Sequence, residues 1–257
     1  MELVVVGSGT AAPDPERAGS AYYIGTGDCR LLLDCGPGAL HHLARFGLPW
    51  SALTHIAITH FHADHTGDLP GLLFALRYAL PAPRTEPLAL LGPPGTAAFL
   101  DRLAAAFGAF ILDPGFPLAV HELAPGAATR ELGPGTRITA HPTPHTAASV
   151  AYRVHGPEGD IGYTGDTGFD PRLADFFRRV DLLVAECSVP DDAPVDTHLS
   201  PARLATLAAL AQPRELLITH VYPPLEALDP LARVRAAGWA GPLRRAHDGL
   251  RIALPGP

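Results

Sequence analysis

The sequence predicts an α/β fold in a single domain that spans residues 1–257. Short apolar segments of strand length alternate along the chain with longer segments that have helical periodicity. Of the 257 residues, 47% are hydrophobic, which is enough to bury one large core. Two stretches of the chain also resemble one another, which suggests two related halves.

Apolar runs bounded by turn residues predict strands at 3–6, 22–24, 30–33, 55–58, 88–91, 137–139, 150–154, 161–163, 182–185, 216–218 and 250–253. Amphipathic spacing predicts helices at 38–46, 69–80, 96–107, 171–178 and 201–211. Ser200 and Pro201 form a good helix start, with a side-chain acceptor at the cap and proline at the first helical position. The segment 81–135 is rich in Ala, Pro and Gly and is interpreted either as a lid on the substrate side or as scaffold.

The internal resemblance has two parts, which occur in the same order in each half. Residues 31–36 (LLLDCG) resemble residues 183–188 (LVAECS), and residues 56–60 (IAITH) resemble residues 216–220 (LLITH). Each half therefore has an apolar strand that ends in an acid, followed by an apolar strand that ends in Thr-His. This order predicts two βα halves that face one another, with both Thr-His strand ends at one site.

Composition excludes several classes of protein. The formal net charge is −7 and every basic residue is arginine, without clusters, which argues against a grip on long nucleic acid. No run of eighteen apolar residues occurs, so we expect no transmembrane helix and no membrane partner. The first residues read as a strand rather than a signal peptide, which predicts a cytoplasmic protein. The three cysteines form no metal or disulfide framework.

Potential metal ligands are most concentrated in the segment His60-Phe61-His62-Ala63-Asp64-His65. This segment lies between a predicted strand and a helix predicted from about Asp68. Neutral imidazole is the commonest side-chain metal ligand, and this segment places four potential ligands within six residues. A turn fans such side chains around a small volume, whereas a regular strand or helix would send some of them away. Two metal ions a few Å apart would fit that fan.

The pattern His-x-His-x-Asp-His resembles the signature of the metallo-β-lactamase superfamily, and the continuation 66–73 (TGDLPGLL) resembles its ribonuclease Z branch. Further landmarks occur in the family's order across nearly the whole chain. They are 33–36 (LDCG), His145 in 142–145 (PTPH), Asp166 in 165–167 (GDT), His220 in 218–220 (ITH), and 246–249 (AHDG). The resemblance implies a four-layer αββα sandwich of two mixed sheets flanked by helices.

The resemblance also implies a ligand set for two divalent metal ions. His60, His62 and His145 would hold one ion, Asp64, His65 and His220 the other, and Asp166 would bridge both. Nitrogen and carboxylate ligands suit zinc, which we rank first, and also accept manganese or iron. Asp34 is expected to orient one of the ligand histidines.

Two further motifs of the ribonuclease Z branch have partial matches. The segment 185–188 (AECS) lies where that branch carries His-Glu-Ala-Thr, so Glu186 is kept while alanine replaces the histidine. His198 lies in a His-x-Ser motif, and the resemblance implies that it approaches the scissile phosphate with Glu186 oriented to it. The expected reaction is attack by a metal-bridging hydroxide, with Asp64 orienting the hydroxide and His198 protonating the leaving oxygen.

One departure from the family narrows the expected substrate. Bacterial ribonuclease Z carries a long basic arm between the third-motif histidine and the bridging aspartate, whereas here only twenty residues separate His145 from Asp166 and they contain one arginine, Arg153. We therefore expect a phosphodiesterase for a small or cyclic phosphodiester. The alternatives are a tRNA 3′-processing endonuclease, a lactone, thioester or β-lactam hydrolase on the same metal site, and a non-enzymatic metal-binding scaffold. A di-iron redox protein is disfavoured because His62 is present, and a homodimer is expected by analogy alone.

Overall fold

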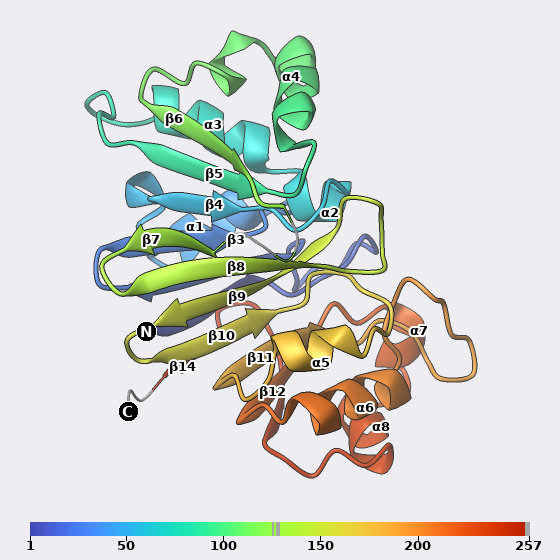
Figure 1. The fold of residues 1–257 in the computed structure, drawn as a ribbon. Helices are drawn as coiled ribbons and strands as arrows, with labels where there is room; N and C mark the ends of the chain where they lie inside the picture. The colour runs from blue at the N-terminus through green and yellow to red at the C-terminus, as the bar shows by residue number, and fades with distance from the viewer. Residues whose placement is uncertain (125, 127–128, 255–257) are drawn as a thin grey trace.

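The computed structural model describes residues 1–124, 126 and 129–254, and these residues form two facing sheets with helices on both outer sides (Figure 1). Each sheet has seven strands in these residues. The order is β14-β1-β2-β3-β4-β5-β6 in the first sheet and β13-β12-β11-β10-β9-β8-β7 in the second. The arrangement is the αββα sandwich that the family resemblance implies.

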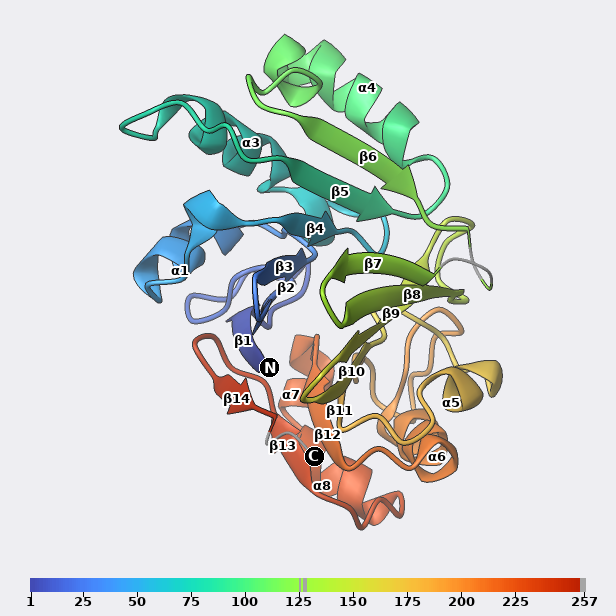
Figure 2. The ribbon, with the colours of Figure 1, turned by 60° about the vertical axis from the view of Figure 1, so that its left-hand side comes forward.

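In the first sheet, strands β14, β1, β2 and β3 pair antiparallel, and the pairs β3–β4, β4–β5 and β5–β6 are parallel. The strands are β1 (Glu2–Gly7), β2 (Ala21–Thr26), β3 (Cys29–Leu33), β4 (His55–Ala57), β5 (Leu88–Gly92), β6 (Leu118–Glu122) and β14 (Arg251–Ala253). The first and last strands of the described chain are therefore neighbours, which brings the two ends together (Figure 2).

In the second sheet, strands β7 to β10 pair antiparallel, and the pairs β10–β11, β11–β12 and β12–β13 are parallel. The strands are β7 (Thr129–Gly133), β8 (Thr136–Pro142), β9 (Val150–Gly156), β10 (Gly159–Tyr163), β11 (Leu182–Glu186), β12 (Glu215–Thr219) and β13 (Leu243–Arg245). Parallel neighbours need crossover connections, and these supply the helices of the outer layers.

The helices lie on the outer sides of the sheets or at the edge where the parallel strands end (Figure 1). They are α1 (Ala39–Arg45), α2 (Ala63–Thr66), α3 (Leu69–Tyr78), α4 (Thr96–Phe107), α5 (Arg172–Phe176), α6 (Pro201–Ala211), α7 (Pro223–Glu226) and α8 (Pro230–Ala236), with 3-10 turns at Trp50–Ala52 and Ala109–Ile111. The Ser200 hydroxyl accepts a hydrogen bond from the Arg203 amide at the start of α6, which confirms the predicted cap.

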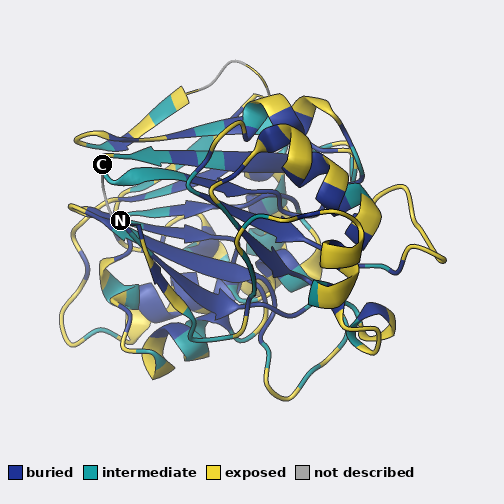
Figure 3. Cartoon of the chain, turned by 90° about the horizontal axis from the view of Figure 1, so that it is seen from below, coloured by how far each residue is buried: buried dark blue, intermediate teal, exposed yellow. Residues whose placement is uncertain are grey.

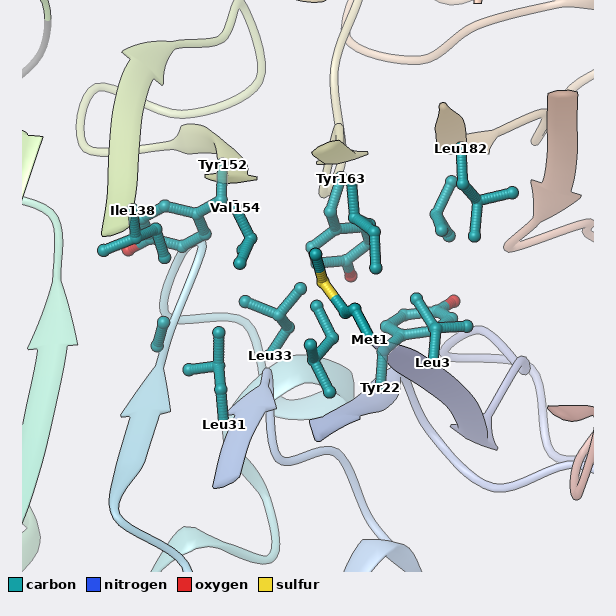
Figure 4. Packing of buried hydrophobic residues seen from close by; sticks show 14 of the residues in the cluster. Met1, Leu3, Tyr22, Leu31, Leu33, Ile138, Tyr152, Val154, Tyr163 and Leu182 are labelled. Atoms are coloured by element: carbon teal, nitrogen blue, oxygen red, sulfur yellow. The ribbon is translucent and has the colours of Figure 1, made fainter. Parts of the chain in front are cut away.

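The core between the sheets explains why the strand sequences read as nearly continuous apolar runs. Successive side chains of a strand point to opposite faces. Leu31 and Leu33 of β3 therefore pack between the sheets, against side chains such as Tyr152 and Ile138 of the second sheet (Figure 4). Leu32, between them in the sequence, instead packs under the outer helices. Both faces of the strand are buried, so neither position can be polar without a partner.

Two further apolar clusters lie between each sheet and its own helices. Most strands are buried along their middle, whereas β6, β7 and β13 are partly exposed and the helices keep an exposed outer face (Figure 3). Burial on both sides fixes the strand registers, because a slip of one residue would exchange every side chain between the two faces. The strand ends at one edge are therefore rigidly placed, and the site described below is built on them.

Every predicted strand and helix overlaps an observed element, but some elements escaped prediction. Strands β6, β7 and β13 are short or partly exposed, so they lack the long apolar run used for the others. Helices α2 and α7 have four residues each, which is too short for a period to be visible. The segment 81–135 supplies β5, α4, β6 and β7 and is therefore scaffold. Among the described helices, none has the length and hydropathy needed to cross a membrane.

The two halves do share one topology, but the sequence resemblance matched each strand of the first half with the wrong strand of the second half, one position too far along. In strand order the two sheets share one pairing pattern, with three antiparallel pairs followed by three parallel pairs. By this pattern β3 corresponds to β10 and β4 to β11, whereas the sequence matched β3 with β11 and β4 with β12. Buried parallel strands all favour similar apolar residues, so their sequences could not set the register.

Candidate active site

The candidate site lies at the edge where the parallel strands end, near α2 and α7 on the right of Figure 1. His60 follows β4, Asp166 follows β10, and His220 follows β12. In α/β folds, side chains at the carboxyl ends of parallel strands converge at one edge of the sheet. The facing sheets bring two such edges together, and both Thr-His strand ends meet here as predicted.

The first cluster consists of His60, His62, His145 and Asp166. The His62 Nδ1 lies 3.0 Å from the His60 Nε2 and 3.1 Å from the His145 Nε2. The Asp166 Oδ2 lies 3.9 Å from the His60 Nε2 and 3.7 Å from the His145 Nε2. Ligand atoms of one tetrahedral zinc ion lie about 3.3 Å apart, because each bond is about 2.0 Å long. Three nitrogens and one carboxylate oxygen thus surround a volume that fits one metal ion.

The second cluster consists of Asp64, His65 and His220, together with the other oxygen of Asp166. The His220 Nε2 lies 3.3 Å from the Asp64 Oδ2, and the Asp166 Oδ1 lies 3.3 Å from the His65 Nε2 and 3.5 Å from the His220 Nε2. Asp166 therefore turns Oδ2 toward the first cluster and Oδ1 toward the second. This is the placement that a bridging carboxylate requires.

Two buried atoms test whether a cation fits. Among the described residues, the His65 Nε2 and the Asp166 Oδ1 are buried and have no hydrogen-bond partner. A buried polar atom without a partner is costly, so such atoms call for an explanation. Both atoms point into the second cluster, where a cation between them would satisfy them together. The donor set of the clusters therefore fits divalent metal ions.

The pKa shifts of His60, Asp64 and Asp166 suit metal binding, whereas Asp166 and Asp34 raise the pKa of His65 against the effect of its burial. Burial, reinforced by the neighbouring His65, lowers the pKa of His60 to about 2, so its ring offers a free lone pair. Burial acts to raise the pKa of Asp64, but the hydrogen bond with His220 and the nearby imidazoles lower it to about 2. Burial likewise opposes ionisation of Asp166, yet His220 and His65 hold its pKa well below its usual range.

Four of the candidate ligand histidines are oriented through the ring nitrogen that faces away from the clusters. His60 Nδ1 contacts the Thr59 hydroxyl at 3.1 Å, and His145 Nδ1 contacts the Thr197 carbonyl at 3.0 Å. His220 Nδ1 contacts the Ser188 hydroxyl at 3.1 Å, and His65 Nδ1 contacts Asp34 at 2.8 Å. Such contacts fix the tautomer and direct the other nitrogen at the metal position.

Asp34 is the anchor of a fully buried network at the end of β3. Its carboxylate accepts hydrogen bonds from the Thr59 amide at 2.7 Å, from the Thr59 hydroxyl, and from the Tyr163 hydroxyl at 2.7 Å. It also holds the His65 ring at 2.8 Å. Asp34 has a positive φ of 55°, which turns the chain sharply after β3 and directs its side chain back toward the cluster. The structure thus places Asp34 against a candidate ligand histidine.

Glu186 and His198 form a second carboxylate–imidazole pair. His198 Nδ1 lies 3.0 Å and 3.2 Å from the two oxygens of Glu186, which also accepts hydrogen bonds from the amides of Thr167 and Leu199. Burial alone would lower the pKa of His198, but the hydrogen bond and charge of Glu186, with Asp166 and Asp64, raise it. A ring nitrogen of His198 also lies within 4.8 Å of ligand atoms of Asp166 and His220, so the pair stands beside both clusters.

A cavity of about 610 Å³ opens onto both clusters. It is lined by ionisable side chains, from the clusters, His198, Asp14 and Arg17, and by uncharged residues. The uncharged part of the wall consists of Thr10, Ala11, Ala12, Pro13, Gly19, Pro37, Ala63 and Tyr222. The sequence analysis missed these residues, because a loop of small residues after a strand carries no chemical pattern.

Asp248 holds the loop that forms this wall. Its Oδ1 accepts hydrogen bonds from the Ser8 amide at 2.9 Å and the Ser8 hydroxyl at 2.7 Å. Its Oδ2 accepts one from the Ala18 amide at 2.7 Å and lies 3.1 Å from His42 Nδ1. One carboxylate thus ties both ends of the loop between β1 and β2. The neighbouring His247 lines an adjoining cavity with Arg17 rather than this one.

The fold and the paired clusters define a metal-dependent hydrolase of the metallo-β-lactamase fold. Residues 29–221 match the family described as beta-lactamase superfamily domain, so the chain belongs to this superfamily. The match covers the segments that carry the two clusters and the Glu186–His198 pair. The superfamily assignment made from the His-x-His-x-Asp-His pattern is confirmed.

Within the superfamily the chain is ribonuclease Z-like. It is 30% identical to a ribonuclease Z of Mycobacterium avium (strain 104) over 281 residues, which covers 100% of this chain and 99% of that protein. The metallo-beta-lactamase fold protein YhfI from Bacillus subtilis has a similar structure, with a TM-score of 0.82, 23% identity, and 98% and 99% of the two chains covered. The short form of human tRNase Z superposes with a TM-score of 0.79, at 24% identity and 99% and 100% coverage. These two structures show the shared fold.

Proposed function

We propose that this hydrolase is a phosphodiesterase that acts on a small or cyclic phosphodiester. The observation that carries the proposal is the Glu186–His198 pair beside the paired clusters, because an imidazole held by a buried carboxylate can donate a proton to a leaving oxygen. Thioester hydrolysis would need no such acid, because a thiolate leaves readily without a proton. A phosphodiester with a poor leaving group would need one.

We assign two divalent ions, zinc by preference, to the ligands that the sequence pattern implied. The first would be held by His60, His62 and His145, the second by Asp64, His65 and His220, with Asp166 shared. When bound, the two ions would supply Lewis acidity for the phosphate and a water of lowered pKa. The paired geometry and the two unpartnered atoms support this assignment.

The remaining steps belong to side chains of the chain. Asp64, near the cavity and deprotonated, would orient the attacking water and accept its proton. His198 would donate its Nε2 proton to the leaving oxygen, and Glu186 would hold the ring and stabilise its charge. Asp34 would keep His65 in position through its contact with Nδ1.

The segment between His145 and Asp166 is short, and its length bears on the size of the substrate. Strands β9 and β10 pair from Gly156 opposite Gly159, so the connection is a two-residue hairpin turn. The twenty residues are used up by this hairpin and its flanking loops, and a tRNA-binding arm has no place there. This supports a small substrate over a long nucleic acid.

A ribonuclease Z activity is the second candidate, because the 30% identity to a ribonuclease Z extends over the whole chain. This candidate would need another surface to replace the arm. Cleavage of a precursor tRNA at its 3′ side would favour it directly.

The test is a comparison of three substrates with zinc- and manganese-loaded protein: bis(p-nitrophenyl) phosphate, a precursor tRNA and a simple lactone. We expect phosphodiester hydrolysis without tRNA cleavage. Turnover of the tRNA or the lactone with no turnover of the phosphodiester would refute the proposed substrate class. The metal clusters would stand in either case.

A further inference from the structure

The cavity at the clusters has room for more than a phosphate group. Its volume is about 610 Å³, and the clusters and His198 line only one part of it. Pockets of roughly 300–1,000 Å³ hold whole small molecules, and their apolar lining follows the organic part of the ligand. The residues beyond the clusters therefore carry information about the group that is attached to the phosphate.

Tyr222 is the one aromatic hydrocarbon ring in this lining. Among the described residues that line the cavity, every other ring belongs to a histidine or a proline. The backbone of Ala11 approaches the Tyr222 hydroxyl, so the ring adjoins the loop between β1 and β2. Ala11 and Ala12 have small side chains, which leave space beside the ring. The lining thus offers one flat surface next to open volume.

The backbone fixes the place of this ring. Tyr222 is followed by two prolines, which restrict the preceding residue to extended backbone, and it has φ −75° and ψ 155°. Its amide donates to the Ser188 carbonyl at 3.2 Å, and its carbonyl accepts from the amides of Leu225 and Glu226 at 3.0 Å each. A tyrosine in so constrained a position loses little conformational entropy when a ligand packs against it.

The ring stands beside the proposed reacting centre. Its centroid lies 5.4 Å from that of His220 and 6.1 Å from that of His198, at interplanar angles of 80° and 69°. Neither imidazole is therefore stacked parallel on it. His220 is a candidate metal ligand and His198 is the proposed acid, so an organic group on a phosphate held between them would begin next to Tyr222.

We infer that Tyr222 determines specificity: its ring packs against the organic group of the phosphodiester and favours a flat aromatic ring over an aliphatic group of similar size. The inference rests on the proposed phosphodiesterase function and deepens it, because it names the chemical class of the group beside the phosphate. Two aromatic rings that pack offset or edge-to-face attract one another beyond the burial of apolar area, which corresponds to about three- to tenfold in affinity. An aliphatic group gains only the burial.

The test measures binding rather than turnover, with three phosphonates of equal charge: phenylphosphonate, cyclohexylphosphonate and methylphosphonate. Isothermal titration calorimetry with the zinc-loaded full chain gives a Kd for each. The shared phosphonate would bind at the clusters, so the ratio of two Kd values reports the organic group. We expect phenylphosphonate to bind about three- to tenfold more tightly than cyclohexylphosphonate, although both carry six carbons.

Four variants assign the preference. Tyr222→Leu and Tyr222→Ile remove the ring and keep an apolar side chain, so the Kd ratio of the phenyl and cyclohexyl ligands should fall to about one. Tyr222→Phe keeps the ring and should keep the ratio. Tyr78→Leu removes a tyrosine ring that is 57% exposed on α3, outside this cavity, and should leave all three Kd values unchanged.

Each outcome decides the proposal. Equal affinity of the wild-type protein for the phenyl and cyclohexyl ligands, or binding of none of the three, would overturn it. A phenyl preference that survives in Tyr222→Leu and Tyr222→Ile would belong to another part of the wall and overturn it too. So would loss of methylphosphonate binding in both, since Tyr222 would then support the clusters. A preference that depends on the ring, without hydrolysis of any phosphodiester, would refute the proposed function while the aromatic subsite stands.

Discussion

The two halves of the molecule share a pairing pattern but use a buried carboxylate in different ways. In the first half, Asp34 at the end of β3 holds His65, and both side chains are fully buried. In the second half, Glu186 at the end of β11 holds His198, whose side chain keeps 15% exposure toward the cavity. Both carboxylates orient an imidazole.

The difference lies in what the imidazole faces. The free nitrogen of His65 points at Asp166 Oδ1 in the metal clusters, whereas that of His198 is left for the cavity. A sealed pair suits a ligand that must not move or exchange its proton with solvent. A pair open to the cavity suits a proton donor. The comparison predicts that the first half controls metal binding and the second half controls turnover.

The largest expected effect comes from Asp166, whose two oxygens face the two clusters. Asp166→Asn should lose most of the bound metal and lower turnover by about 10³-fold or more, since metal stabilisation of several kcal/mol is lost. Metal content by atomic absorption and hydrolysis of bis(p-nitrophenyl) phosphate measure both. The exposed Asp175, substituted by Asn, is a matched control that should change neither quantity. An Asp166→Asn protein with two bound ions would contradict the shared role.

The variant His198→Ala is expected to distinguish the role of the second half, turnover, from that of the first half, metal binding. It removes the proposed proton donor and should lower kcat by about 10²- to 10³-fold, the usual range for general acid catalysis. The metal content should stay at the wild-type value, because the proposed ligands are untouched. A substrate with a good leaving group should be less affected than one with an alkyl leaving group. Loss of metal in this variant would contradict its assignment.

Asp34→Asn and Glu186→Gln are compared in two quantities, metal affinity and kcat, and each substitution should change a different one. Asp34→Asn should weaken metal affinity by about 10- to 100-fold, as loss of a carboxylate behind a ligand histidine usually does. Glu186→Gln should leave metal affinity unchanged and lower kcat, because it weakens only the charge held on His198. Titration with a chelator and steady-state kinetics separate the two. A metal defect in Glu186→Gln equal to that of Asp34→Asn would remove the distinction between the halves.

The smallest effect is expected from Tyr163→Phe. The Tyr163 hydroxyl donates to Asp34 at 2.7 Å in the interior, and its removal should cost about 1 kcal/mol of unfolding free energy. Metal affinity should fall slightly, since Asp34 keeps its contact with His65. Urea denaturation measures the stability. Tyr152→Phe, which loses a hydrogen bond to the Ile58 carbonyl instead, is the control that should change stability without changing metal affinity.

The sequence predicted the chemistry at strand ends better than the surroundings of the cavity. His60, His62, Asp64 and His65 lie in one short segment after an apolar run, so their pattern is visible without a structure. His145 and His198 could be identified only through the family resemblance, because they lie in irregular loops. Metal identity, the small-molecule partner, a homodimer and a cytoplasmic location stay predictions.

What the sequence could not predict depends on contacts between distant parts of the chain. Arg17 contacts Glu226, which lies 209 residues away in the sequence, and nothing near either residue indicates the pairing. The prediction of which strands correspond in the two halves was wrong for a related reason. The apolar strands are interchangeable as sequences, and only their hydrogen-bonded neighbours distinguish β10 from β11.

The tie from Asp248 to the loop between β1 and β2 has a consequence for the order of assembly. The contacts of Asp248 with Ser8 and Ala18 span 240 and 230 residues of sequence. Contacts of such high sequence separation form late and slow the folding of a domain. During synthesis, this part of the cavity wall cannot close until Asp248 has left the ribosome. The segment with His60, His62, Asp64 and His65 is therefore made long before the loop between β1 and β2 is fixed in place.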